Sequence, residues 1–337
     1  MSTKKFEKVR WGIIGVGNVT EVKSGPAFYK TENSALVAVM RRNAEKVADY
    51  AKRHKISKYY TDASDLINDP EVDAVYVATP PDSHASYAIE AMRAGKPVYV
   101  EKPMARNYKE CLDMLKVSKE TGVPIWVAYY RRTLPAFLKA KELIEQDTIG
   151  KPLLVNVKLY KQADERGKTL NEMHWHVFPE IAGAGHFFDL ASHQFDYLDF
   201  VFGTVTNVKG TASNRAGLYP AEDTVSGTWE HESGVIGTGS WCFVVDESSE
   251  ADEIKIIGEK GELSLPCFSP GNLKLTTSEG TTELKFTNPE HISQNLVKQV
   301  VGELCGLEKC VSTGVSAART SWILDEIVKN YYKDETQ

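Results

Sequence analysis

The sequence lacks several features that define specialised classes of protein. Its five cysteines are scattered and have no CxxC spacing, so they indicate neither a disulfide framework nor a zinc ribbon. The N-terminal segment MSTKKFEKVR has no apolar h-region, which argues against a secretory signal. No run approaches the roughly 18 apolar residues of a membrane-spanning helix. We therefore expect a cytoplasmic protein with no membrane partner.

An excess of positive charge is also absent. The 40 Lys and Arg residues against 46 Asp and Glu give a net charge of −6, which argues against a nucleic-acid partner. A chain of 337 residues is long for a single core. We expect two domains, residues 1–128 and 129–337, and the C-terminal helix of the second can pack back on the first.

Short apolar runs alternate with helical patterns over about the first 125 residues. The runs are nearly continuous, as in parallel strands that are covered on both faces; they are VRWGII, ALVAVM, DAVYVA, KPVYVE and VPIWVA. Asn107 followed by Glu110 has the spacing of a capping box, and Gly95 and Gly122 end predicted helices. This order predicts an α/β fold with a doubly wound parallel sheet of the Rossmann type.

The pattern changes near Gly150 to segments in which apolar and polar residues alternate. Turn signals at residues 232–234 and 278–280 join such segments as antiparallel strands. Three helices are expected, one over FFDLASHQFDYLDFVF and two at about 290–304 and 315–332. We predict an α+β domain with a large, mostly antiparallel sheet.

The segment GIIGVGNV has the context of a dinucleotide-binding turn. Gly15 and Gly17 follow a predicted strand, and Asn18 and Val19 open the next helix, so a pyrophosphate can approach the backbone there. Thr20 occupies the usual place of a third glycine, and helix–strand packing is the role of that position. Farther on, Gly25-Pro26 predicts that the helix breaks and restarts. A glycine turn without a ligand is the alternative.

Two arginines follow the second predicted strand, where an acidic residue normally binds the adenine ribose. Arg41 stands in the place of that acid, and Arg42 follows it. A guanidinium there can pair with a 2′-phosphate. We therefore favour NADP as the cofactor, with NAD as the alternative if the arginines are only a solvated surface pair.

Two further groups of residues are candidates for catalysis. Glu101 and Lys102 follow a predicted parallel strand, and a partly desolvated lysine there can exchange a proton with a substrate hydroxyl. Asp189 and His193 share one helix face with Asp196, and a carboxylate beside an imidazole can orient it for proton transfer. The segment MHWH contains two His residues and no clear third ligand, so we predict no metal site.

Together these motifs resemble the Gfo/Idh/MocA oxidoreductase family, which includes glucose–fructose oxidoreductase and inositol dehydrogenase. The resemblance rests on GIIGVGNV, on VATPPDSHASYAIEAMRAGKPVYVEKPMA and on DLASHQFD. It implies a Rossmann domain followed by an open-faced sheet domain, and a homodimer or homotetramer built through that sheet.

The resemblance also implies roles for single residues. Lys102 matches the catalytic lysine, His193 the catalytic histidine and Asp189 the substrate-binding aspartate. The remaining matches are to cofactor-binding segments: Thr79, Pro80, His84, Glu101 and, more loosely, Arg131.

The expected activity is hydride transfer between a nicotinamide and a hydroxyl or carbonyl carbon of a polyhydroxylated small molecule. That substrate would be a sugar, a sugar derivative or a cyclitol. Three alternatives stay open: a redox-neutral glycoside hydrolase that uses NAD, a reductase of a non-sugar such as a dihydrodiol, and a cofactor-sensing regulator on the same fold.

Overall fold

The structure is a computed structural model that describes residues 5–163 and 174–334. By its contacts the chain divides into two compact units. The first contains Met1–Tyr130 and Pro289–Ala318, and the second contains Arg131–Asn288 and Arg319–Gln337.

The first unit is built on a six-stranded sheet in which every neighbouring pair is parallel. Its strands are β1 (Val9–Ile14), β2 (Ser34–Met40), β3 (Lys58–Tyr60), β4 (Ala74–Val77), β5 (Val98–Val100) and β6 (Ile125–Val127). Their order across the sheet is β3-β2-β1-β4-β5-β6, the doubly wound arrangement that was predicted. Only β3 was not foreseen, because its three residues include two that are half-buried and one that is exposed.

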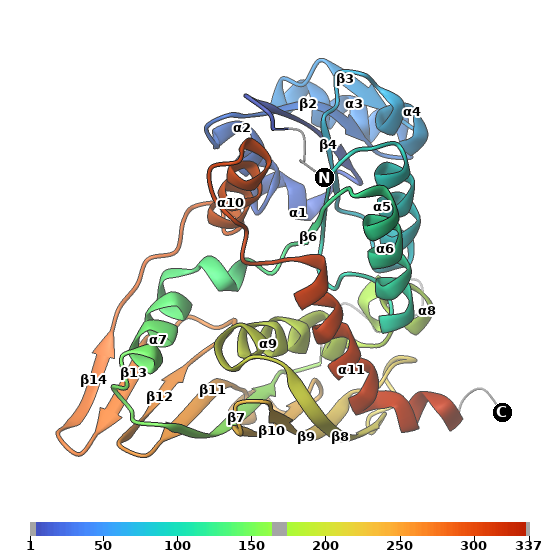
Figure 1. Cartoon of the computed structure of the whole chain (residues 1–337). Coiled ribbons are helices and arrows are strands. Elements are labelled where there is room, and N and C mark those ends of the chain that lie inside the picture. The colour runs from blue at the N-terminus through green and yellow to red at the C-terminus, as the bar shows by residue number, and fades with distance from the viewer. Residues whose placement is uncertain (1–4, 164–173, 335–337) are drawn as a thin grey trace. The chain divides into compact units, whose positions relative to one another are not determined.

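Helices cover both faces of this sheet. One hydrophobic core joins the strands to α4 (Ala63–Asn68), α5 (His84–Arg93) and α6 (Tyr108–Thr121), and Figure 1 shows α5 and α6 side by side. The core on the other face includes residues of α2 (Gly25–Lys30), α3 (Ala44–His54) and α10 (Gln294–Cys305). A helix from near the end of the chain thus completes the core of the N-terminal unit.

Local signals account for the ends of α6. The Asn107 side chain accepts a hydrogen bond from the Glu110 amide at 2.9 Å, as predicted. The Glu110 carboxylate instead accepts from the Arg106 amide at 3.1 Å, so the reciprocal half of the capping box lies one residue earlier than expected. Gly122 ends the helix with φ of 70°, a left-handed conformation that glycine adopts without a Cβ clash.

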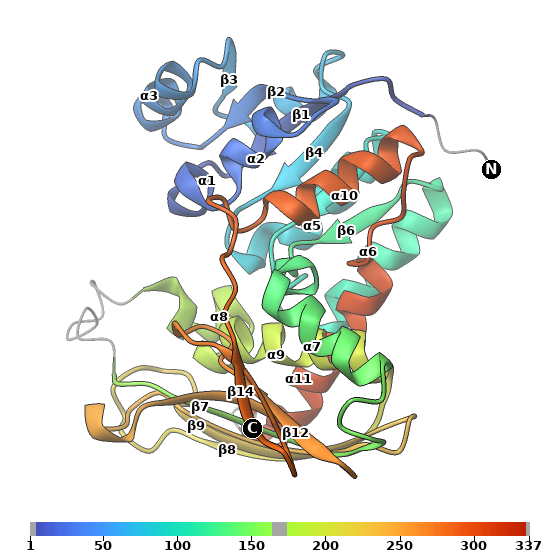
Figure 2. The ribbon, with the colours of Figure 1, turned by 90° about the vertical axis from the view of Figure 1, so that its left-hand side faces the viewer.

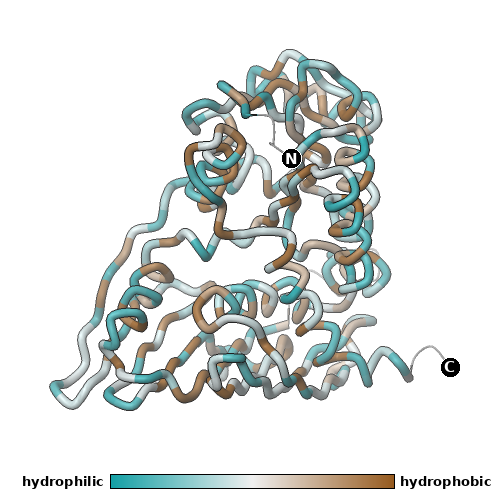
Figure 3. The backbone as a smooth tube through the Cα atoms, in the orientation of Figure 1, coloured by the Kyte–Doolittle hydropathy of each residue, from teal (hydrophilic) through white to brown (hydrophobic). Residues whose placement is uncertain are grey.

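The second unit contains an eight-stranded sheet that is antiparallel except where β7 pairs with β10. The order across it is β14-β13-β12-β11-β7-β10-β9-β8. Its strands are β7 (Pro152–Tyr160), β8 (Val205–Ser213), β9 (Thr224–His231), β10 (Ile236–Cys242), β11 (Ala251–Gly258), β12 (Gly261–Leu265), β13 (Leu273–Thr277) and β14 (Gly280–Leu284). Both predicted hairpin turns are present, between β9 and β10 and between β13 and β14. Figure 3 shows teal and brown stretches following one another in this part of the chain.

Helices pack on one face of the second sheet. Figure 2 shows α7 (Pro135–Glu145) and α9 (His186–Phe202) on that face. The later part of α11 (Gly314–Asp334) packs closely on β8 and β9, because a Cβ at Gly210 or Gly227 would contact Ile327. In the ranges that the structure describes, no helix combines the length and the hydrophobicity that crossing a membrane requires.

Candidate functional site

The predicted cofactor residues of the first unit lie at the carboxyl ends of four consecutive parallel strands. Arg41 and Arg42 follow β2, and the glycine loop follows β1. The segment Thr79–Pro80 follows β4, and the segment Glu101–Lys102 follows β5. Because ligands of open α/β sheets bind beyond the carboxyl ends of the strands, the fold brings these four segments to the edge where a dinucleotide can bind.

The two glycines of the loop are required for different reasons. Gly15 has φ of +93°, and a Cβ there would lie 2.9 Å from the Thr79 backbone nitrogen. Gly17 is extended, and its Cβ would contact only the Gly15 carbonyl oxygen, at 3.9 Å. Protein packing therefore explains Gly15 but not Gly17. The open space in front of Gly17 fits the close approach of a pyrophosphate, so these residues fit a dinucleotide.

Thr20 closes the loop by hydrogen bonds. Its hydroxyl accepts from the Gly17 amide and donates to the Gly17 carbonyl oxygen, both at 2.9 Å. The Thr20 carbonyl oxygen accepts from the buried Tyr50 hydroxyl at 2.8 Å. Packing was the role predicted for this position, and the structure adds a polar link that holds α1 (Asn18–Val22) to the loop.

The predicted break after α1 is present, and α2 restarts with Pro26 in its first turn. A Cβ at Gly25 would lie 2.1 Å from the Thr20 carbonyl oxygen, so only glycine fits there. The Arg53 guanidinium binds Glu21 at 2.7 Å and lowers the pKa of that carboxyl to about 2. His291 bonds the Val22 carbonyl oxygen at 2.7 Å. These contacts therefore stabilise the break between α1 and α2.

Within residues 5–163 and 174–334, no carboxylate pairs with the guanidinium group of Arg41 or Arg42. Arg41 is half-buried and Arg42 is exposed. The Arg41 amide donates to the Tyr60 carbonyl oxygen at 3.1 Å, which fixes its backbone beside β3. Neither side chain forms an ion pair with any residue of the described ranges, and Asn43 then caps α3. The positive charge at the end of β2 is thus available to an anion.

His84 joins two of the predicted cofactor segments. One ring nitrogen lies 2.7 Å from the Thr79 carbonyl oxygen and the other 3.0 Å from the Pro103 carbonyl oxygen. The imidazole is buried, and this burial lowers the pKa of His84. Its position between two backbone carbonyls indicates that it holds the turn after β4 to the turn after β5.

The carboxyl group of Glu101 is held beside the turn that contains Lys102. The Tyr76 hydroxyl forms a hydrogen bond with it, and the Lys102 amide donates to its other oxygen at 3.2 Å. Burial raises the pKa of Glu101. The peptide bond between Lys102 and Pro103 is cis.

The second unit contains the catalytic candidates of α9. Asp189 is half-buried and His193 is buried, and the imidazole of His193 lies against the Phe268 ring with 5.9 Å between their centroids. The Nε2 atom of His176 lies 3.8 Å from the Asp189 carboxylate. His176 thus adds a neighbour of Asp189 that spacing could not predict, because the residues between the two do not form a single helix.

Asp196 does not belong with these candidates, although it shares their helix face by spacing. It is completely buried and binds the Arg132 guanidinium at 2.7 and 2.8 Å. Burial raises the pKa of Asp196 to about 6, against the opposing effect of Arg132. This residue is part of a structural ion pair.

Arg131 was predicted to bind the cofactor, and its side chain is buried in the second unit. Its Nε donates to the Cys267 carbonyl oxygen at 2.9 Å, and its guanidinium carbon lies 4.3 Å from the centre of the Phe268 ring. The role proposed for it stays a prediction.

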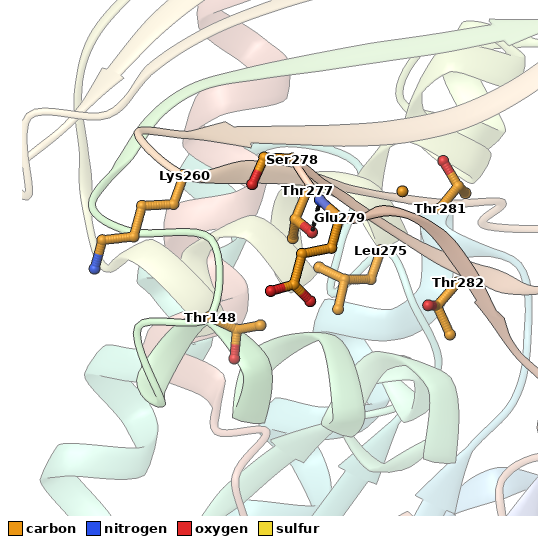
Figure 4. Close-up of a pocket in the computed structure, with 9 residues that line it drawn as sticks. Thr148, Lys260, Leu275, Thr277, Ser278, Glu279, Thr281 and Thr282 are labelled. Carbon is orange, nitrogen blue, oxygen red and sulfur yellow. Dashed lines mark hydrogen bonds between the residues drawn. The ribbon is translucent and has the colours of Figure 1, made fainter.

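A hollow that contains none of the predicted residues lies at the edge of the second sheet. Figure 4 shows the Thr277 and Glu279 side chains of the β13–β14 hairpin and Thr148 opposite them. Within residues 5–163 and 174–334, no group of three or more His, Cys, Asp or Glu residues is arranged to hold a metal ion.

Comparison with known proteins gives the family. The sequence model of the oxidoreductase family with an NAD-binding Rossmann fold matches residues 9–129, and that of the GFO/IDH/MocA C-terminal domain matches residues 137–264. The sequence is 40% identical to Oxidoreductase P35 of Formosa agariphila over 94% of this chain and 98% of that protein. The chain therefore belongs to the GFO/IDH/MocA family and is an NAD(P)-binding oxidoreductase.

Two further similarities concern proteins with named substrates. The chain is 29% identical to 1,5-anhydro-D-fructose reductase of Ensifer adhaerens over 82% of each chain. The structure of levoglucosan dehydrogenase in complex with NADH and levoglucosan superposes with a TM-score of 0.83. It is 22% identical and covers 97% of this chain and 98% of its own, a likeness that shows the shared fold.

Proposed function

We propose that this protein is an NADP-dependent dehydrogenase or reductase that acts on a CH–OH group of a sugar, a sugar derivative or a cyclitol. The observation on which the proposal rests is the edge of the first sheet, where four consecutive strands end in the candidate cofactor residues. The unpaired Arg41 and Arg42 favour NADP, because a guanidinium matches a 2′-phosphate. The similarity to 1,5-anhydro-D-fructose reductase favours a sugar-like substrate.

In this proposal Lys102 transfers the proton of the reacting group. During oxidation it takes the proton that leaves the substrate hydroxyl, and during reduction it returns one to the carbonyl oxygen. His193 assists as an acid or base, and Asp189 orients the substrate through its hydroxyl groups. A bound nicotinamide supplies or accepts the hydride.

The first test is the absorbance of reduced nicotinamide with either NADP or NAD and a panel of sugars, cyclitols and diols. The panel includes 1,5-anhydro-D-fructose for the reductive direction and levoglucosan for the oxidative one. A signal with NADP that is much weaker with NAD supports the proposal. Release of an aglycone without net redox would instead identify a redox-neutral hydrolase.

The role of Lys102 is tested by Lys102→Met. We expect turnover to fall by roughly 10²–10⁴ while the cofactor still binds, because only proton transfer is lost. Lys109→Met is the matched control, since that lysine is exposed on α6. Unchanged turnover in Lys102→Met would remove this residue from the mechanism.

A further inference from the structure

A buried chain of hydrogen bonds connects the turn that contains Lys102 to the break after α1. The Tyr76 hydroxyl on β4 contacts the Glu101 carboxyl and lies 3.0 Å from the Ser24 hydroxyl. The Ser24 hydroxyl in turn lies 3.3 Å from the Val19 carbonyl oxygen. Tyr76 and Ser24 are completely buried. The chain therefore joins two segments of the first unit that are far apart in the sequence.

The donors and acceptors of this chain balance in either protonation state of Glu101. If the carboxyl is protonated, it donates to Tyr76, Tyr76 donates to Ser24, and Ser24 donates to Val19. If it is ionised, Tyr76 donates to the carboxylate, and the Ser24 proton serves the Tyr76 oxygen or the Val19 carbonyl oxygen. Burial raises the pKa of Tyr76 well above its usual value, so the phenol keeps its proton. The hydrogen bonds can therefore form in either state. Only the ionised carboxylate places a negative charge beside Lys102, so protonation of Glu101 can alter turnover without breaking the link.

Both ends of the chain adjoin residues of the candidate cofactor edge. Glu101 precedes Lys102, and the Lys102 amide binds its carboxyl. Ser24 lies in the break after α1, and Tyr50 and His291 form hydrogen bonds with carbonyl oxygens of α1. The positive charges of Lys102 and Lys23 both act on the Glu101 carboxyl. Tyr76 therefore links the turn that contains Lys102 to the break after α1.

We propose that Tyr76 is a positioning residue: through Glu101 and Ser24 it holds the Lys102 turn in register with the loop that binds the dinucleotide. This inference rests on the proposed function. In this role Tyr76 contacts neither the cofactor nor the substrate. We therefore expect its substitution to change turnover and not the affinity for the cofactor.

The adjacent strand offers a matched control for Tyr76. Tyr99 on β5 pairs in register with Tyr76, is equally buried, and has its ring centroid 5.1 Å away. Its hydroxyl has no hydrogen-bond partner in the part of the chain that the structure describes. Tyr76→Phe and Tyr99→Phe therefore remove the same atom from neighbouring sites, and only the first breaks the link.

The experiment compares the two variants with wild type in steady-state kinetics. We expect Tyr76→Phe to lower kcat by about tenfold with little change in the KM of the cofactor, because a hydrogen bond to a buried carboxyl is lost. Tyr99→Phe should stay within about twofold of wild type. Adding Glu101→Gln to Tyr76→Phe should lower kcat no further than the more severe single variant, since Tyr76 acts through Glu101. Equal effects of the two tyrosine variants would overturn the proposal.

The pH profile of kcat separates positioning from a loss of folding. The groups that face the Glu101 carboxyl are Tyr76, Tyr99, Lys23 and Lys102. The Tyr76 hydrogen bond favours the ionised carboxyl, so its loss should move the acidic limb of the profile to higher pH in Tyr76→Phe and not in Tyr99→Phe. Identical profiles for all three proteins would count against the proposal.

Hydrogen exchange gives a readout that needs no substrate. We expect Tyr76→Phe to speed amide exchange in residues 19–25 and 101–105, and Tyr99→Phe to do so in neither. If Tyr76→Phe speeds amide exchange but leaves turnover unchanged, the link is only structural, and the proposal that Tyr76 positions Lys102 is overturned. If wild type reduces no cofactor with any substrate, the proposed function fails, and the link between the segments is still decided by the exchange rates.

Discussion

Two pairs of consecutive arginines stand in opposite environments. In the second unit, Arg131 and Arg132 are about 5% exposed or less, and both have partners. Arg132 binds Asp196 and lies 3.2 Å from Asp199, which also binds Arg319 at 2.7 Å. In the first unit, Arg41 and Arg42 have no ion pair among the described residues, and Arg42 is exposed.

The difference follows from the cost of removing charge from water. A buried guanidinium needs carboxylates and carbonyls around it, since an unpaired charge in a protein interior is strongly unfavourable. A guanidinium at the surface keeps its hydration and needs no partner. An arginine at a strand end that has no ion pair can therefore bind a ligand. A buried arginine that is paired with carboxylates instead stabilises the fold. Identical dipeptides thus have different consequences when they are mutated.

The largest effect should come from breaking the buried pair with Arg132→Met. Removing one partner leaves the Asp196 carboxylate buried and uncompensated, so we expect the free energy of unfolding to fall by about 3–5 kcal/mol. Urea unfolding measures this change. Arg10→Ala is the control, because Arg10 also binds its carboxylate, Asp73, at 2.8 Å but is 40% exposed. Equal losses in the two variants would contradict the distinction between buried and exposed charge.

Glu222 sharpens the comparison, because it is a completely buried acid whose partners are neutral. It accepts from the Gly185 amide at 3.0 and 3.1 Å and contacts the Tyr332 hydroxyl. Burial raises the pKa of Glu222 from 4.5 to about 7. Between these values the folded protein binds the proton and the unfolded chain does not, so the free energy of unfolding should fall as pH rises, by about 3 kcal/mol in all.

Urea unfolding at a series of pH values between 4.5 and 7.5 measures that dependence. Glu222→Gln cannot ionise and should flatten most of it. The part that remains includes the contribution of Asp196, whose pKa is raised to about 6, and that of Glu101, whose pKa is also raised; both act with the same sign as Glu222. An equal slope in wild type and Glu222→Gln would show that another group is responsible.

The smallest effect concerns the unpaired arginines. Arg41→Ala should weaken NADP binding by about tenfold or more, because a charge-assisted hydrogen bond is lost, and leave NAD binding unchanged. Fluorescence titration with both cofactors measures this difference. Arg42→Ala, made separately, shows which arginine contacts the 2′-phosphate. The melting temperature should not change in either variant, and equal weakening of both cofactors would refute the role of Arg41.

Much of the architecture could be predicted because its signals are local. Runs such as VRWGII indicate strands covered on both faces, and Gly25-Pro26 indicates a broken helix. The strand β3 has no such run and was missed. The return of α10 to the first unit was not foreseen, because the option considered concerned the C-terminal helix. A helical pattern in the sequence does not show which core its apolar face will join.

The candidate residues of the first unit could be proposed from the sequence for a related reason. In a parallel sheet every strand ends at the same edge, so residues that follow different strands lie at one edge once the strands are identified. Asp196 is the counterexample. It lies close to Asp189 and His193 in the sequence, but its partner Arg132 lies 64 residues away in the chain. The period of apolar residues cannot predict that contact.

The sequence by itself therefore determined the order of the strands and helices that have clear local signals, the glycine loop, the break after α1 and the family. These properties depend on backbone preferences and on the period of apolar residues, which act over a few positions. Only the tertiary structure decided which charges are paired. It placed Tyr76 between Glu101 and Ser24, His176 beside Asp189, and Glu222 against Tyr332. Such contacts depend on burial, and burial is a property of the assembled core.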